Sequence, residues 1–125
     1  MTMKSIACCA ALLLAASLPL AAQTALFEQP VLITSAGQSA DVQIASVQAR
    51  KAGLQSTLVK AASAKDLASV KTLVLVLGAS LKGLGAAGLD TAKEKARVDA
   101  LLAEAKAKGI PVLLLHLGGE TRRGD

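Results

Sequence analysis

The stretch that decides the fold is TLVLVLGASLKGLGAAGLD, residues 72–90, in which an apolar run leads directly into a glycine-rich segment. Residues 72–77 are apolar on both faces, which is typical of a strand buried between two layers of helices. A helix with clear terminal signals follows residue 90. We therefore expect residues 78–90 to be the loop at the carboxyl end of a central parallel strand, where open α/β sheets bind their ligands.

The helix after this loop is expected to be capped by Thr91, which has the spacing of a capping box with Glu94. Its buried stripe is expected to be Val98, Leu101, Leu102 and Ala105. A second helical stripe covers residues 39–52, with Ser35 or Ser39 as its cap. Both helices end in basic residues and a glycine before an aliphatic segment. This order is the pattern of repeated βαβ units with parallel strands.

Three further strands are expected at residues 31–33, 54–60 and 112–117, with a short helix or loop over residues 61–70. Right-handed crossovers favour a small, three-layer, doubly wound, mainly parallel α/β sheet of the flavodoxin-like order 2-1-3-4. The less apolar strand at residues 54–60 suits the sheet edge. Because no helix is expected after the last strand, either a partner covers that face or the domain is incomplete at its C-terminus, and we favour the second.

Residues 1–25 are expected to be a secretory signal peptide, and residues 26–125 a single α/β domain that is a fragment of a longer one. Lys4 precedes an apolar run over residues 6–20, and cleavage is expected after Ala22 or Ala25. The run is shorter than the about 20 residues that span a bilayer. We therefore favour a cleaved signal over a membrane anchor, a periplasmic or secreted location, and no membrane association after cleavage.

Composition excludes several function classes. Without Lys4, thirteen basic residues stand against nine acidic ones, a mild net charge of +4, and Phe27 is the only aromatic residue. Modules that bind single-stranded nucleic acid combine a basic groove with aromatic platforms, so no nucleic-acid partner is expected. Both cysteines precede residue 26 and there is one histidine, so we expect no metal site and no cofactor. The oligomeric state is left open.

Three loops, at residues 34–39, 78–90 and 118–125, should meet at one edge of the sheet, because the carboxyl ends of parallel strands lie together there. The first runs into a helix N-terminus and the third carries paired arginines, two features that favour a small anionic ligand. The alternative for each loop alone is an ordinary solvated turn. The candidate ligand-binding residues are Ser35, Gly37, Gln38, Ser39, Ser80, Lys82, Gly83, Gly85, Glu120, Arg122 and Arg123.

Two patterns bear on nucleotide binding and catalysis. Residues 83–88 match G-x-G-x-x-G, but the glycines begin five residues beyond the strand and the ribose-binding position falls on basic residues, so a nucleotide fingerprint does not fit. His116 is the one candidate catalytic residue, acting with a loop serine in a hydrolase or transferase. The alternative is a strand histidine that is simply hydrogen-bonded. Whether the chain is an enzyme stays open.

Residues 30–42 (PVLITSAGQSADV), 75–90 (LVLGASLKGLGAAGLD) and 109–125 (GIPVLLLHLGGETRRGD) resemble a family of exported bacterial proteins of unknown function. The resemblance implies a single flavodoxin-like or Rossmann-like domain behind a signal peptide, and a family domain that continues past this chain's end. It implies no activity and no catalytic residue. Three hypotheses follow: a domain that binds an anionic small molecule, a hydrolase or transferase, and a protein-interaction module.

Overall fold

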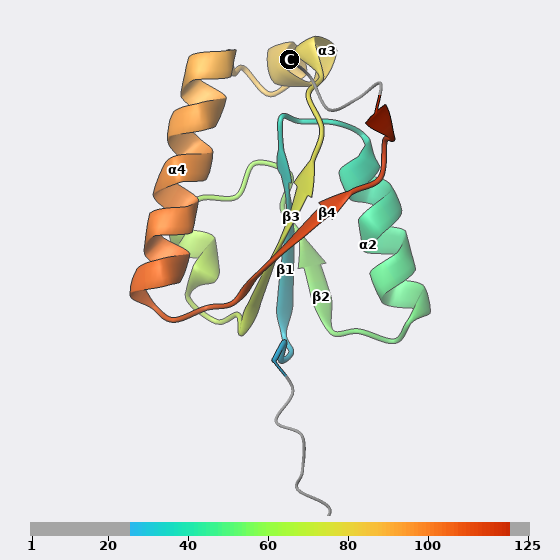
Figure 1. The fold of residues 1–125 in the computed structure, drawn as a ribbon, viewed down its shortest axis with the longest axis vertical. Helices are drawn as coiled ribbons and strands as arrows, with labels where there is room; N and C mark the ends of the chain where they lie inside the picture. Colours follow the sequence, from blue (N-terminus) through green and yellow to red (C-terminus); the bar gives the residue numbers. More distant parts are fainter. Residues whose placement is uncertain (1–25, 121–125) are drawn as a thin grey trace, which may run out of the picture.

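The computed structural model describes residues 26–120, and the signal peptide expected over residues 1–25 lies outside them. Its centre is a four-stranded sheet ordered β2-β1-β3-β4, in which all neighbouring strands are parallel (Figure 1). The strands are β1 (Val31–Ala36), β2 (Ser56–Leu58), β3 (Thr72–Leu77) and β4 (Val112–His116). This arrangement confirms the predicted flavodoxin-like α/β fold, with β2 at the sheet edge.

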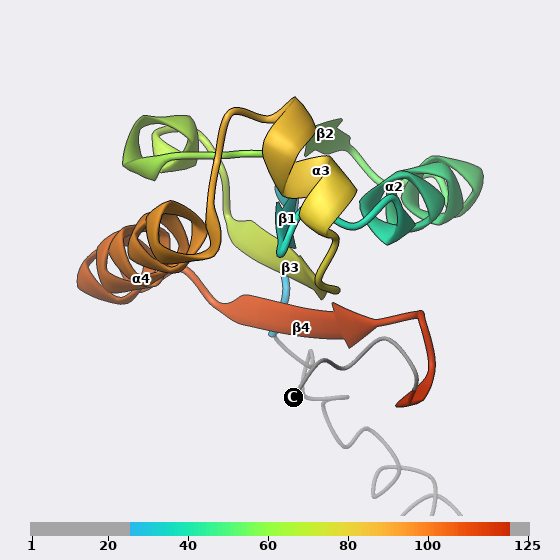
Figure 2. The same ribbon diagram turned by 90° about the horizontal axis from the view of Figure 1, so that it is seen from above.

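Helices lie on both faces of the sheet and give three layers (Figure 2). Helix α2 (Asp41–Lys51) lies on one face, while α4 (Thr91–Ala107) and the short 3₁₀ helix η1 (Ala64–Leu67) lie on the other. The short helix α3 (Leu81–Ala86) lies beyond the carboxyl end of the sheet (Figure 1). Helix η1 falls in the segment for which the sequence left a helix and a loop as alternatives.

The core is divided into two clusters because successive side chains of a strand point to opposite faces. The cluster on the α2 face contains Val31, Ile33, Val42, Ala45, Val74 and Val76. The cluster on the α4 face contains Leu32, Ala62, Leu67, Leu73, Leu101 and Ala105. Strands β1 and β3 are buried on both faces, which explains why their sequences are apolar without alternation.

Strand β1 extends to Ala36 and includes polar residues that were expected in the turn after it. Thr34 is fully buried, and its hydroxyl donates to the Lys60 carbonyl at 3.0 Å and accepts the Ala62 N–H at 3.2 Å. A buried hydroxyl is tolerated in a strand when its hydrogen bonds are satisfied in this way. The chain therefore turns only at Gly37, where φ is +100°.

The N-terminus of α4 is capped by Asp90, whose Oδ1 accepts the Lys93 N–H at 2.7 Å. The predicted capping box between Thr91 and Glu94 is therefore wrong, because the helix is capped one residue earlier and Thr91 is already its first residue. The Glu94 side chain points into the protein instead, where only 6% of it is exposed. This inward carboxylate organises the carboxyl end of the sheet.

The glycine-rich segment after β3 contains helix α3, where the sequence predicted a loop over residues 78–90. Ser80 caps this helix, since its Oγ accepts the Gly83 N–H at 3.0 Å. Gly83 lies so close to the loop after β1 that an added Cβ would be 2.0 Å from the Gln38 carbonyl oxygen. Gly85 belongs to the same helix and has no atom within 4 Å of the corresponding position. Gly83 is therefore needed for the contact between α3 and the loop after β1.

Replacing these two glycines should have opposite effects on stability. We expect Gly83→Ala to lower the free energy of unfolding by about 1–3 kcal/mol, because the new methyl overlaps a backbone atom. Gly85→Ala should raise it by up to about 1 kcal/mol, because alanine favours the helix and meets no neighbour. Urea denaturation measures both. Equal effects of the two substitutions would contradict the packing described for α3.

Candidate functional site

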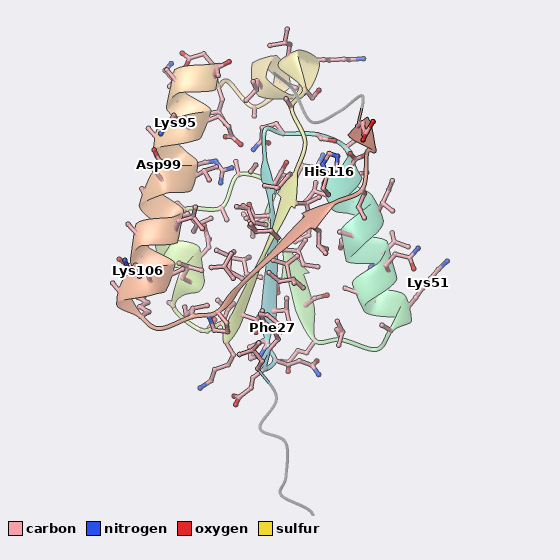
Figure 3. The ribbon with its side chains drawn as sticks, in the orientation of Figure 1. Phe27, Lys51, Lys95, Asp99, Lys106 and His116 are labelled. Carbon is pink, nitrogen blue, oxygen red and sulfur yellow. The ribbon has the colours of Figure 1, made fainter. Side chains whose placement is uncertain are left out.

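The predicted site residues do gather at one edge of the sheet, where β1, β3 and β4 end. Gly37, Gln38 and Ser39 follow β1, while Ser80, Lys82 and Gly83 follow β3. His116 ends β4 (Figure 3). Glu120 is exposed near the end of the described chain, and the predicted Arg122 and Arg123 lie outside the described residues.

The loops after β1 and β3 are bonded directly to each other. The Ser39 N–H donates to the Gly78 carbonyl at 3.1 Å, and the Ser80 N–H donates to the Gly37 carbonyl at 2.9 Å. Gln38 lies between them, with φ of +60°, and forms a bridge with Ala79. A Cβ on Gly37 would be 2.4 Å from the Gly78 oxygen. At these residues, the crevice that the topology suggested is filled by backbone contact.

Glu94 of α4 accepts hydrogen bonds from the loop after β1. Its Oε1 accepts the Gly37 N–H at 2.8 Å and the Gln38 side-chain amide at 3.1 Å. A backbone N–H at the carboxyl end of a strand is the kind of donor that holds an anionic ligand in α/β proteins. Here the donor on Gly37 binds a carboxylate of the protein itself.

Arg97, one turn along α4, pairs with Glu94 and continues the network. Its Nε and Nη2 donate to the two carboxylate oxygens at 2.9 and 2.7 Å. Its Nη1 donates to the Ala62 carbonyl at 2.7 Å and Nη2 donates to the Ser35 carbonyl at 2.5 Å. Only 12% of its side chain is exposed. The guanidinium therefore joins α4, β1 and the segment between β2 and η1.

The network determines the ionisation of Glu94. Burial alone would raise the pKa of this carboxyl, but the hydrogen bonds from Arg97, Gly37 and Gln38 and the Arg97 charge hold the pKa below its usual value of 4.5. The carboxylate is therefore charged at neutral pH and fully coordinated by donors. A group of this kind suits a structural role more than proton transfer, which requires a pKa near the working pH.

The three predicted serines have structural partners or are buried. The Ser80 hydroxyl caps α3, and Ser39 Oγ accepts the Asp41 N–H at 3.1 Å at the start of α2. The N-cap position of α2 is nevertheless Ala40, without a side-chain cap bond, so neither expected cap is confirmed. Ser35 is a fully buried residue of β1. Lys82 and Gly85 are exposed on α3. Among the described candidates, Lys82 offers the exposed cationic side chain.

His116 lies at the carboxyl end of β4 with both ring nitrogens close to backbone carbonyls. Nδ1 is 3.3 Å from the Leu77 oxygen and Nε2 is 2.7 Å from the Gly119 oxygen. These contacts match the alternative of a hydrogen-bonded strand histidine. In residues 26–120, no group of three or more histidine, cysteine or acidic side chains is placed to hold a metal ion. No helix of that range is long and apolar enough to cross a bilayer.

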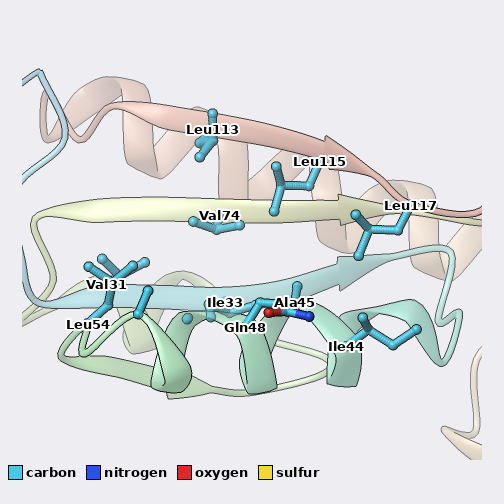
Figure 4. Close-up of a pocket in the computed structure, with 12 residues that line it drawn as sticks. Val31, Ile33, Ile44, Ala45, Gln48, Leu54, Val74, Leu113, Leu115 and Leu117 are labelled. Atoms are coloured by element: carbon cyan, nitrogen blue, oxygen red, sulfur yellow. The ribbon is translucent and has the colours of Figure 1, made fainter.

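A second surface that the sequence did not identify is an apolar groove of about 420 Å³ between α2 and β4 (Figure 4). Its floor includes Leu113 and Leu115 of β4, and Ile44 of α2 lies at one side. Of the twelve lining residues only Gln48 is polar: Val31, Ile33, Ile44, Ala45, Gln48, Ala49, Ala52, Leu54, Val74, Leu113, Leu115 and Leu117. Ile44 is 52% exposed and Leu117 is 46% exposed.

The sequence carried signals for Glu94 and for the groove, although neither was recognised. Glu94 and Arg97 occupy the same helical face as Leu101 and Ala105, so two charged residues extend a buried stripe. The apolar residues of β4 alternate between two faces, and no element was expected to cover one of them. Only the three-dimensional arrangement shows that Glu94 bonds the loop after β1 and that the α2-side face of β4 borders a groove.

Comparison with known proteins gives a family but no activity. The family model described as a domain of unknown function (DUF6305) matches residues 28–125. No curated protein and no solved structure matches the chain.

Removing the Glu94 carboxylate should be strongly destabilising. We expect Glu94→Ala to lower the free energy of unfolding by about 3–5 kcal/mol, because Arg97 is left as a buried charge without its partner. Asp99→Ala is the control on the same helix: it breaks an exposed pair with Lys95 (Figure 3) and should cost at most about 1 kcal/mol. Urea denaturation at pH 7 compares them, and equal losses would contradict the structural role of Glu94.

The pH dependence of stability should report the same carboxylate. Because the pKa of Glu94 is lower in the folded protein than its usual value, the unfolded chain binds more protons between those two pKa values, and stability increases with pH there. The contribution is complete above pH 4.5 and is lost as the pH falls through the folded pKa. Denaturation of the wild type and Glu94→Gln across pH 2–6 tests this. Parallel pH profiles for the two proteins would contradict it.

Proposed function

Since this chain belongs to the DUF6305 family, a domain of unknown function, its function has to be inferred from its geometry, and we propose an interaction module. The proposed ligand is an amphipathic helix of another protein, bound in the apolar groove between α2 and β4. This is the third of the hypotheses that the sequence supported. The observation that carries it is a groove lined by eleven apolar side chains and one amide.

The groove has the position of a covering helix in a doubly wound sheet. Helix α2 packs against β1, β2 and β3, so the half of this face that belongs to β4 has no helix beside it among the described residues. Sheets of this kind normally have helices over both faces, and neighbouring helices pack about 8–10 Å apart. A helix lying beside α2 would bury Ile44 of α2 and Leu113, Leu115 and Leu117 on the β4 side.

The charges near the groove favour an acidic partner helix. The lining itself carries no charge, and the last turn of α2 contains Arg50 and Lys51, which precede the lining residues Ala52 and Leu54. The whole chain has a formal net charge of +5. Complementary charge increases the rate of association and selects among partners. The proposed partner is thus a helix with a stripe of leucine or similar apolar side chains, and with acidic residues at the end that lies near Arg50 and Lys51.

Binding of a small anionic molecule at the carboxyl ends of the strands is the second candidate. Its support is the gathering of the predicted residues at one edge, with the exposed cation of Lys82 among them. The Gly37 N–H is occupied by Glu94, and Ser80 is occupied by its capping bond, which is why we rank this candidate lower. The hydrolase or transferase hypothesis has less support, because His116 contacts backbone carbonyls.

We also propose that the domain acts outside the cytoplasm, in the periplasm or after secretion. The support is the sequence of residues 1–25, with one lysine before an apolar run and small residues after it. A partner helix would then belong to another exported protein. The location is independent of the groove and is tested separately, by fractionation of cells that produce the full chain.

Peptide binding tests the interaction module. The probe is a synthetic amphipathic peptide of about 18 residues, or five helical turns, with leucines at helical spacing and glutamates at one end, followed by fluorescence anisotropy. We expect Ile44→Lys and Leu117→Lys to weaken binding at least about tenfold, which corresponds to about 1.4 kcal/mol, because each places a charge in the groove.

Leu81→Lys is the matched control, since Leu81 is 84% exposed on α3, outside the groove lining. A second control peptide has the same composition in scrambled order and should bind weakly. If the wild type binds the amphipathic peptide no more tightly than Ile44→Lys does, the groove is not the binding surface. If inorganic phosphate stabilises the protein and Lys82→Ala removes the effect, the second candidate replaces the first.

A further inference from the structure

In the sheet formed by residues 26–120, β4 is an edge strand with the composition of a central one. The sheet order places it at the edge opposite β2, yet its sequence VLLLH contains no charged residue and no proline. Natural edge strands are usually protected by shortness, charge, proline or a bulge. Strand β2 shows such protection, because it has three residues, of which Ser56 and Thr57 are polar. The unprotected edge of β4 is therefore suited to pairing with another strand.

The hydrogen-bond pattern fixes which groups of β4 are directed outward. The Leu73 N–H donates to the Pro111 carbonyl at 3.0 Å, and Leu73 is the register partner of Val112. In a parallel pair, a residue bonds to the two neighbours of its register partner, and alternate residues direct their backbone groups to opposite sides. The odd-numbered residues thus bond β3, and Val112, Leu114 and His116 direct their N–H and C=O groups to the free edge.

We propose that a second copy of this chain pairs along this edge, with the two β4 strands antiparallel and the two-fold axis at Leu114. In that register Leu114 lies opposite Leu114 of the second copy, and Val112 lies opposite His116 of the second copy. All three residues whose backbone groups are directed outward then form hydrogen-bonded pairs. The interface is isologous and closes as a dimer, so the two four-stranded sheets become one continuous sheet.

The side chains are compatible with this register. Leu114 is 57% exposed in one copy, and at the two-fold axis it would be covered by the same leucine. Leu113 would lie opposite Leu115 of the second copy, which extends the apolar floor of the groove across the interface. Because β4 contains no charged residue, the pairing brings no like charges opposite each other, which would destabilise an antiparallel pair. Helices α2 and α4 pack mainly on β1, β2, β3 and η1, so neither of these helices covers this edge.

This inference rests on the backbone pattern of β4 and does not depend on what the groove binds. Its test uses sedimentation velocity of the full chain under reducing conditions, so that Cys8 and Cys9 cannot form a disulfide. We expect the wild type to be dimeric at a concentration of about 0.1 mM and above, because mass action favours the dimer as the protein concentration rises. Leu114→Lys and Leu114→Glu should each weaken the dimer at least about tenfold, because like charges would then meet at the axis.

The decisive sample is an equal mixture of Leu114→Lys and Leu114→Glu, in which opposite charges meet and the dimer should return. Because Leu114 is largely exposed in one copy, both variants should keep the wild-type circular dichroism spectrum, and the return of the dimer itself demonstrates intact folding. Leu81→Lys, on α3, is the control and should remain dimeric. The proposal is overturned by a monomeric wild type, by a dimer that persists in Leu114→Lys, or by a mixture that stays monomeric.

Discussion

The buried ion pair between Glu94 and Arg97 is the interaction on which the carboxyl end of the sheet depends. Glu94 holds the loop after β1 through the Gly37 N–H and the Gln38 side chain, and Arg97 holds the Ser35 and Ala62 carbonyls. Isolated buried charges are costly, but here the donors and acceptors are matched. The consequence is that groups which could bind an external anion are already bound inside the protein.

The strand order and the main helices could be predicted from the sequence because apolar periodicity and terminal glycines are local signals. Residues 72–77 form β3 as predicted, and the four parallel strands have the expected order. The turn after β1 could not be placed, because Thr34 is accommodated in the strand by bonds to residues 26 and 28 positions away. Such long-range partners leave no local pattern.

The candidate site also depends on contacts between distant residues. In the sequence, the glycines after β3 fit both a ligand-binding loop and a closely packed segment. Only the contact between Gly83 and Gln38 distinguishes the two. Glu94 has the spacing of a capping residue and is used as an internal anion instead. The two proposals therefore concern surfaces that no element of residues 26–120 covers, namely the groove beside α2 and the outer edge of β4.

We propose that this domain binds a partner helix through the groove between α2 and β4, while contacts within the protein close the carboxyl edge of the sheet. Chemical-shift mapping of a ¹⁵N-labelled sample distinguishes the two surfaces, with separate titrations of the acidic amphipathic peptide and inorganic phosphate. We expect the peptide to shift the amide signals of Ile44, Ala45 and Leu115, while phosphate leaves those of Gly37 and Lys82 unchanged. Phosphate-dependent shifts at Gly37 and Lys82, with no effect of the peptide on the groove, would contradict it.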